Sequence, residues 1–208
     1  RRELDKLGST VATGMQLSIQ PRPGVEIAQV YGYPAEPLGT ARGAVIPIAD
    51  LHAGETRKVV LRLRLRADAL GPLALADVAL HVRPVDALAS RTLRVAAQVA
   101  ITDDAQLIAA GVSREAIGHI ERARTADALD QATRAYEAGD TRGATQMLEQ
   151  RRQQVRDVAN SAGVPGLAGE LEQVTIEADG YFQAAPAESR DGKRARKKNR
   201  TRAFDLMR

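Results

Sequence analysis

The chain has 208 residues, of which 44% are hydrophobic and 27% are charged, a composition typical of a globular protein. It contains no cysteine, which excludes disulfides and thiolate metal sites. No apolar run approaches the roughly 20 residues of a membrane span, and residues 1–5 lack the apolar core of a signal peptide. The chain begins without Met, which leaves open that its native N-terminus lies upstream, so the localisation stays unknown.

The net charge of +4 is distributed unevenly along the chain. Residues 190–202 contain eight Lys or Arg and one Asp, a local net charge of +7, which leaves −3 over the remainder. The positive charge therefore belongs to the C-terminal segment, and the rest of the chain is mildly acidic. Because residues 186–208 are also nearly devoid of apolar residues before Phe204, we expect them to form a flexible basic tail.

Apolar and polar residues alternate in the first half of the chain. The clearest strand is predicted at 57–66, where leucines share one face and arginines share the other. Further strands are expected at 11–20, 25–33, 43–48, 73–82 and 91–101, bounded by Gly and Pro. Six such strands favour an antiparallel β-sandwich over residues 9–102. Its core is expected to contain Leu61, Leu63, Leu65, Val78, Leu80, Val95 and Val99.

Apolar residues recur at helical spacing after residue 102. Asp103 and Asp104 are good caps for a short helix ending near Ala110, and Ser113 is a good cap for the next helix. Longer helices are expected over residues 114–137, 141–161 and 167–183. Gly139 as a C-cap followed by Asp140 as an N-cap indicates a tight turn between two helices. Residues 103–185 are expected to form a helical hairpin or small helical bundle, closed by Leu129, Tyr136, Met147 and Leu148. The predicted fold class is thus α+β with segregated halves.

The sequence contains no recognisable catalytic constellation. His52, His81 and His119 fall on a predicted turn, strand and helix without the convergent spacing of metal ligands. Helix capping accounts for the neighbouring Asp103 and Asp104 without a cation. No nucleophile elbow and no glycine-rich phosphate loop is present. We therefore expect no enzymatic activity, no catalytic residue, no metal and no cofactor in this segment.

Three strings carry a resemblance to a known family. PGVEIAQVYGY at 23–33 and IADLHAGETRKVV at 48–60 resemble the region directly C-terminal to the von Willebrand factor type A domain in bacterial proteins of that class. AYEAGDTRGA at 135–144 resembles the helical hairpin that follows there. The resemblance covers about residues 1–185 and implies that residues 1–8 end the last helix of an upstream A domain. It implies a non-enzymatic protein–protein interaction or scaffold module accessory to that domain.

The A domain's own metal motif, Asp-x-Ser-x-Ser, is absent. The nearest string runs from Asp86 to Ser90 and has Leu88 where the first serine ligand belongs. The resemblance therefore implies that any divalent cation binds an upstream A domain outside this sequence. The identity of the protein partner and the oligomeric state stay open.

The basic tail supports a competing hypothesis, in which the tail binds nucleic acid or an anionic surface. No aromatic residue lies inside the basic run, which disfavours stacking on single strands and makes nucleic acid the less favoured partner. A further interpretation is that residues 204–207 dock onto a protein. The candidate binding residues of the tail are Lys193, Arg194, Arg196, Lys197, Lys198, Arg200, Arg202, Phe204, Leu206 and Met207.

Overall fold

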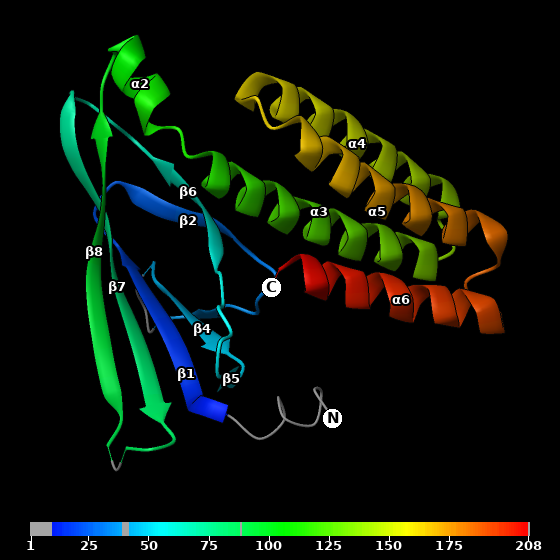
Figure 1. Cartoon of the computed structure of the whole chain (residues 1–208), viewed down its shortest axis with the longest axis horizontal. Helices are drawn as coiled ribbons and strands as arrows, with labels where there is room; N and C mark the ends of the chain where they lie inside the picture. The colour runs from blue at the N-terminus through cyan, green and yellow to red at the C-terminus, as the bar shows by residue number, and fades with distance from the viewer. Residues whose placement is uncertain (1–9, 39–41, 88, 208) are drawn as a thin grey trace. The chain divides into compact units, whose positions relative to one another are not determined.

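A computed structural model describes residues 10–38, 42–87 and 89–207 (Figure 1). The chain divides into two compact units after Val112. The first, here called the β unit, contains strands and one short helix, and the second, the helical unit, contains four long helices in its described residues. Residues 1–8, expected to end an upstream helix, lie outside the described residues.

The strands of the β unit lie where alternation predicts them. All six predicted strands are confirmed, and two very short ones, β3 and β5, were not predicted. The described elements are β1 (Thr10–Pro21), β2 (Val25–Tyr31), β3 (Glu36–Pro37), β4 (Ala44–Ile48), β5 (Leu51–His52), β6 (Val60–Leu65), β7 (Gly71–Pro84), β8 (Arg91–Ile101) and α2 (Ala105–Gly111).

The strands form two antiparallel sheets of very different size. The larger sheet has six strands, in the order β3-β4-β1-β7-β8, with β5 also paired to β1. In its centre Leu17 pairs with Ile46 on one side and with Leu80 on the other. β2 and β6 form a separate two-stranded sheet. β8 pairs only with β7 among the described strands, so it forms an edge of the larger sheet.

The core of the β unit lies between these two sheets. Ile19 and Ile46 on the larger sheet are almost inaccessible, and Leu61 from β6 packs against them. Along β6 the leucines are partly buried while Arg62 and Arg64 are exposed, which confirms the predicted facing of that strand.

The core assignment of Val95 and Val99 on β8 is wrong. Both are exposed, Val95 to 66%, although their partner strand β7 contributes the partly buried Val78 to the core. The physical reason is the width of the covering sheet. Two strands spaced about 4.8 Å apart cover a narrower area than the larger sheet presents, so the β8 edge is left uncovered.

The predicted fold class requires correction. A sandwich needs two sheets of comparable extent, whereas here six strands form one sheet and two form the other. Of the two alternatives for the helical half, a hairpin is wrong, because the described residues form a small bundle of four long helices, the fourth in the segment predicted to be a flexible tail. The division between the units also falls after α2, not before it at residue 102.

The helical unit consists of α3 (Arg114–Glu137), α4 (Thr141–Ala162), α5 (Pro165–Ala184) and α6 (Arg190–Leu206). The caps predicted at Asp104, Ser113 and Asp140 are confirmed, since each side chain accepts a hydrogen bond from a backbone N–H in the first turn of its helix. Gly163 ends α4 in the left-handed conformation, with φ of 65°, which glycine adopts at low cost.

Helices α3, α4 and α5 share an apolar core. The predicted core residues Leu129, Tyr136 and Leu148 are confirmed as fully buried, and Tyr136 stacks on Phe182 with ring centroids 4.6 Å apart. The Tyr136 hydroxyl donates a hydrogen bond to the Ala185 carbonyl just beyond α5. Met147 was predicted to close this core and is exposed, because the buried face of α4 runs through Leu148 and its i±4 neighbours.

An ion pair lies inside the helical unit. The side chains of Glu121 on α3 and Arg151 on α4 are only 2% and 4% exposed, and the guanidinium donates to the carboxylate. Arg151 Nε also donates to Thr125 Oγ1 at 3.1 Å, and Arg124 lies 3.1 Å from the Glu121 carboxylate. These hydrogen bonds compensate for part of the cost of removing two charges from water. The pair therefore fixes how α3 and α4 lie against each other.

We expect Arg151→Ala to lower the free energy of unfolding by about 3–5 kcal/mol, because it leaves the Glu121 carboxylate buried without its main partner. Urea denaturation followed by far-UV circular dichroism measures the loss. The control is the double variant Glu121→Leu/Arg151→Met, which removes both charges and should be clearly more stable than Arg151→Ala. If the single variant is as stable as the wild type, the pair does not hold the two helices.

Candidate functional site

The basic segment forms helix α6, which packs on α3 and α5 (Figure 1). Its buried face contains Gly192, Ala195 and Asn199. A Cβ at position 192 would lie 2.1 Å from the carbonyl oxygen of Pro186, so only glycine fits this close approach. The amide of Asn199 is fully buried and has no hydrogen-bond partner among the described residues. The expectation of a flexible tail is thus wrong.

Two arginines of α6 are held by one carboxylate at the end of α3. Arg200 Nη2 lies 2.7 and 3.0 Å from the two carboxylate oxygens of Glu137, and Arg196 Nη1 lies 3.6 Å from the same group. Arg196 also lies 4.0 Å from the exposed Glu188. Glu137 thus balances one of the two guanidinium charges that converge on it.

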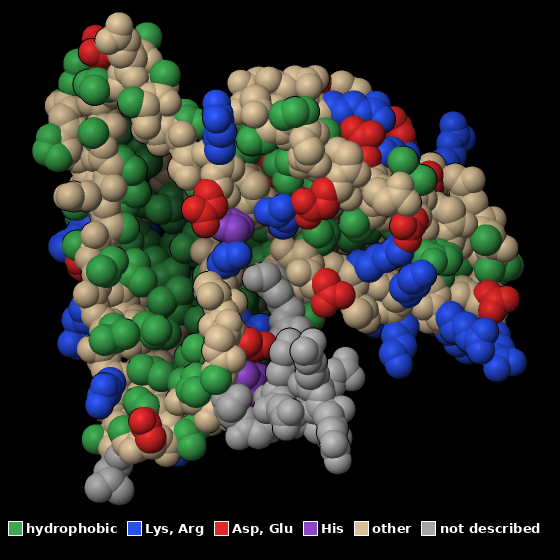
Figure 2. Space-filling view, viewed as in Figure 1, with side chains coloured by type: hydrophobic (Ala, Val, Ile, Leu, Met, Phe, Trp, Pro, Cys, Tyr) green, Lys and Arg blue, Asp and Glu red, His purple; other side chains and the backbone are tan. Residues whose placement is uncertain are grey.

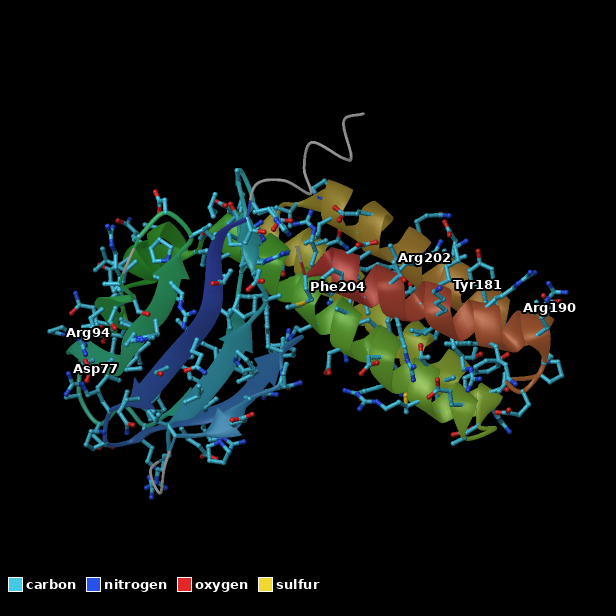
Figure 3. The ribbon with its side chains drawn as sticks, turned by 90° about the horizontal axis from the view of Figure 1, so that it is seen from below. Asp77, Arg94, Tyr181, Arg190, Arg202 and Phe204 are labelled. Carbon is cyan, nitrogen blue, oxygen red and sulfur yellow. The ribbon has the colours of Figure 1, made fainter. Side chains whose placement is uncertain are left out.

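Two further cations of α6 contact α5 on the other side. The Lys198 ammonium lies 4.6 Å from the centre of the Tyr181 ring and donates to the Tyr181 hydroxyl, while the Arg202 guanidinium lies 5.6 Å from the same ring. Arg202 also pairs with Glu177. Burial lowers the pKa of Arg202 from its usual value. Figure 3 shows Tyr181 beside Arg202, with Arg190 and Phe204 near opposite ends of α6. Lys198 and Arg202 thus hold α6 against α5.

A groove runs along the remaining side of α6, beside the end of α3. Lys193 and Lys197 line it and have no ion-pair partner within the part of the chain that the structure describes. Residues 193, 197, 200 and 204 follow at i, i+4, i+7 and i+11, so they lie on one helix face. We call this the α6 groove, and its lining residues are Glu137, Lys193, Arg196, Lys197, Arg200, Thr201 and Phe204. Lys and Arg side chains gather over α6 in Figure 2.

The ten residues predicted for the tail therefore have different environments. Five of them line the α6 groove, two contact Tyr181, and Arg194 points to solvent, 3.7 Å from Asp191. Leu206 packs into the apolar core of the helical unit, and Met207 is buried. Only Phe204, at 58% exposure, presents a large apolar side chain, so residues 204–207 do not form an exposed docking peptide. Sequence reasoning missed Glu137, Glu177 and Tyr181, which no local pattern relates to α6.

A second surface lies on the β unit, at the edge strand β8. Leu93 and Val95 are 60% and 66% exposed, and Val99 on the same face is also exposed. Leu93 pairs with Leu80 and Val95 pairs with Val78, so this face of β8 continues the apolar face of β7. Figure 2 shows apolar side chains gathered over β7 and β8. We call Leu93, Val95 and Val99 the β8 strip.

The three histidines have ordinary hydrogen-bond partners. His52 contacts Thr10 at 3.2 Å, His81 contacts Thr92 at 2.7 Å, and His119 contacts Glu115 at 3.4 Å. In the described residues, no group of three or more His, Cys, Asp or Glu is arranged to hold a metal ion. Over those same residues, no helix combines the length and the hydropathy needed to cross a bilayer.

Two ion pairs join α5 to its neighbours near the surface. Arg122 on α3 donates to both carboxylate oxygens of Glu170 at 2.8 and 2.7 Å, and Arg156 on α4 donates to Glu172 at 2.7 and 3.0 Å. Each guanidinium, by hydrogen bonding to the charged carboxylate, lowers the pKa of that glutamate below its usual value.

Comparison with known proteins shows a similarity of fold and no match in sequence families. No family model matches the sequence, and no curated protein matches it. The fold is similar to that of a solved structure described as von Willebrand factor type A from Catenulispora acidiphila, with a TM-score of 0.54 and 20% identity, covering 83% of this chain. A structure of the ArnB paralog VWA2 from Sulfolobus acidocaldarius matches with a TM-score of 0.38 and 13% identity, covering 93% of this chain.

The first likeness shows the fold alone: this chain has a fold similar to that of part of the Catenulispora acidiphila von Willebrand factor type A structure, and this finding replaces the predicted class of a segregated sandwich and hairpin. The chain spans 42% of that solved chain and 43% of the second, less than half of each.

The close approach at Gly192 gives a matched pair of variants. Gly192→Ala should lower the melting temperature and weaken α6 docking, because the new Cβ would meet the Pro186 and Ala187 carbonyls. In the Gly180→Ala variant of α5 the new Cβ would have no neighbouring atom within 4 Å, so this substitution should stabilise the helix by up to about 1 kcal/mol. Thermal unfolding by circular dichroism compares the two. Equal effects from both variants would mean that α6 does not pack as closely as described.

The lowered pKa values of Glu170 and Glu172 predict a pH dependence. Their ion pairs stabilise the folded chain fully above the unfolded pKa of about 4.3 and lose that contribution as pH falls through the lower folded values. At neutral pH the variant Glu170→Gln/Glu172→Gln should therefore be less stable than the wild type, and the difference should shrink toward about pH 3. Urea denaturation at several pH values measures this difference, and a constant gap would contradict the assignment.

Proposed function

We propose that this chain is a non-enzymatic protein–protein interaction module that acts as an accessory to a von Willebrand A-type domain. The fold likeness to part of a larger von Willebrand factor type A protein supports a role as one part of such an assembly. The sequence resemblance of residues 23–33, 48–60 and 135–144 points the same way.

The observation that carries the proposal is the β8 strip. Covering a Leu or Val side chain contributes about 1.5–3 kcal/mol, so the exposed Leu93 and Val95 offer a binding partner a substantial gain. β8 is also an edge strand of 11 residues, whose outward N–H and C=O groups can pair with an added strand. An apolar face beside an unpaired edge is suited to protein contact.

A pull-down from native host lysate tests this proposal. We expect the wild type to retain a stoichiometric protein partner at moderate salt, and Leu93→Thr/Val95→Thr to lose it, because threonine keeps the β preference and removes apolar area. The control is Ala96→Thr/Gln98→Thr, which changes the same strand on its opposite face and should keep the partner. Circular dichroism verifies that both variants fold.

Two outcomes would contradict the proposal. One is recovery of the same partners by the wild type and by both variants. The other is recovery of nucleic acid alone, lost at about 0.3 M salt, which would favour a polyanion binder.

A further inference from the structure

We infer that the α6 groove binds an acidic peptide segment, with carboxylates at Lys193 and Lys197 and an apolar side chain against Phe204. This inference rests on the proposed interaction function and deepens it by naming the chemistry of a partner. It uses a surface of the helical unit that does not include the β8 strip.

The charge balance of the groove favours an anionic ligand. Four cations line it, Lys193, Arg196, Lys197 and Arg200, against the single carboxylate of Glu137, so the lining carries a net charge of +3. Like charges held on one helix face repel one another, and an incoming carboxylate relieves that repulsion. The two lysines are the members of this set without an ion-pair partner among the described residues, so carboxylates can bind them without displacing an existing pair.

The groove is supported by rigid contacts on both sides of α6. Glu137 holds Arg196 and Arg200 from α3, while Tyr181 and Glu177 hold cations from α5. Because α6 is fixed on two sides, the lysines project from a preorganised helix and not from a flexible tail. Preorganisation lowers the entropy lost on binding.

The groove favours a peptide over a nucleic acid. Arg196 and Arg200 already pair with Glu137, so a phosphate that binds their guanidinium groups would compete with an existing ion pair. The lining includes one aromatic ring, Phe204, which gives a strand of bases no series of stacking partners. The exposed ring at one end of a row of cations suits a peptide with carboxylates followed by an apolar residue.

The helix spacing sets the spacing of the ligand. At 1.5 Å per residue, Lys193 and Lys197 are separated by about 6 Å along α6, and Lys197 and Phe204 by about 10 Å. An extended peptide advances about 3.3 Å per residue, and its side chains alternate between two faces. Two carboxylates two residues apart and an apolar residue about four positions further therefore share the face that meets the groove.

Fluorescence anisotropy tests the inference with the full chain and a synthetic probe. The probe is a fluorescein-labelled Gly/Ala peptide with two glutamates two positions apart and a leucine four positions later. We expect saturable binding, weakened at least about tenfold by Lys193→Glu/Lys197→Glu. The control Arg190→Glu/Arg194→Glu makes the same charge change at exposed positions outside the groove and should weaken binding by less than about threefold.

Phe204→Ala tests the apolar part of the site. It should remove the preference for the leucine probe over the same peptide with glycine in that position, because Phe204 supplies the apolar contact. Circular dichroism confirms that α6 remains folded in each variant.

Three results would overturn the inference: no binding of the probe by the wild type, equal loss in the two charge variants, or an oligonucleotide of equal charge that binds as tightly as the probe. Leu93→Thr/Val95→Thr separates this inference from the proposed function, because it alters the β8 strip alone and should leave probe binding unchanged. Loss of probe binding in that variant would also contradict an independent α6 groove.

Discussion

Unequal sheet width is the constraint on which the surface chemistry of the β unit depends. Hydrophobic burial requires a second layer, and here two strands serve as that layer for a sheet of six. Ile19 and Ile46 lie beneath the covering strands and are buried, whereas Leu93 and Val95 lie beyond them and are exposed. One continuous apolar face thus serves as a core at its centre and as a potential contact surface at its edge.

The helical unit combines charged and apolar packing. Glu121 and Arg151 join α3 to α4 in the interior, while Glu137 and Glu177 join α6 to its neighbours nearer the surface. Buried pairs fix geometry more than they add stability, since the attraction is offset by desolvation. Charge pairing also divides the cations of α6 into those that hold the helix and those that remain for a ligand.

The sequence predicted individual elements better than their assembly. Alternation located the strands, and capping residues such as Ser113 and Asp140 located helix starts, because both signals are local. The exposure of Val95 depends on how many strands of the second sheet cover β8, and the apolar alternation within β8 carries no information about that number. Helix α6 was missed because its contacts come from distant residues, among them Glu137 and Tyr181, and because its apolar content is low. The groove could therefore not be derived from the basic run alone.

The buried amide of Asn199 has a consequence for the dynamics of the helical unit. A buried polar group without a partner costs about 1–3 kcal/mol, and this cost belongs to the docking of α6. When α6 detaches, the amide regains hydrogen bonds to water, so detachment is less costly than the apolar contacts of α6 alone would suggest. Segments of this kind open in sub-global fluctuations before the core does. The groove exists only while α6 is docked, and occupancy of the groove is thereby coupled to the order of the last helix.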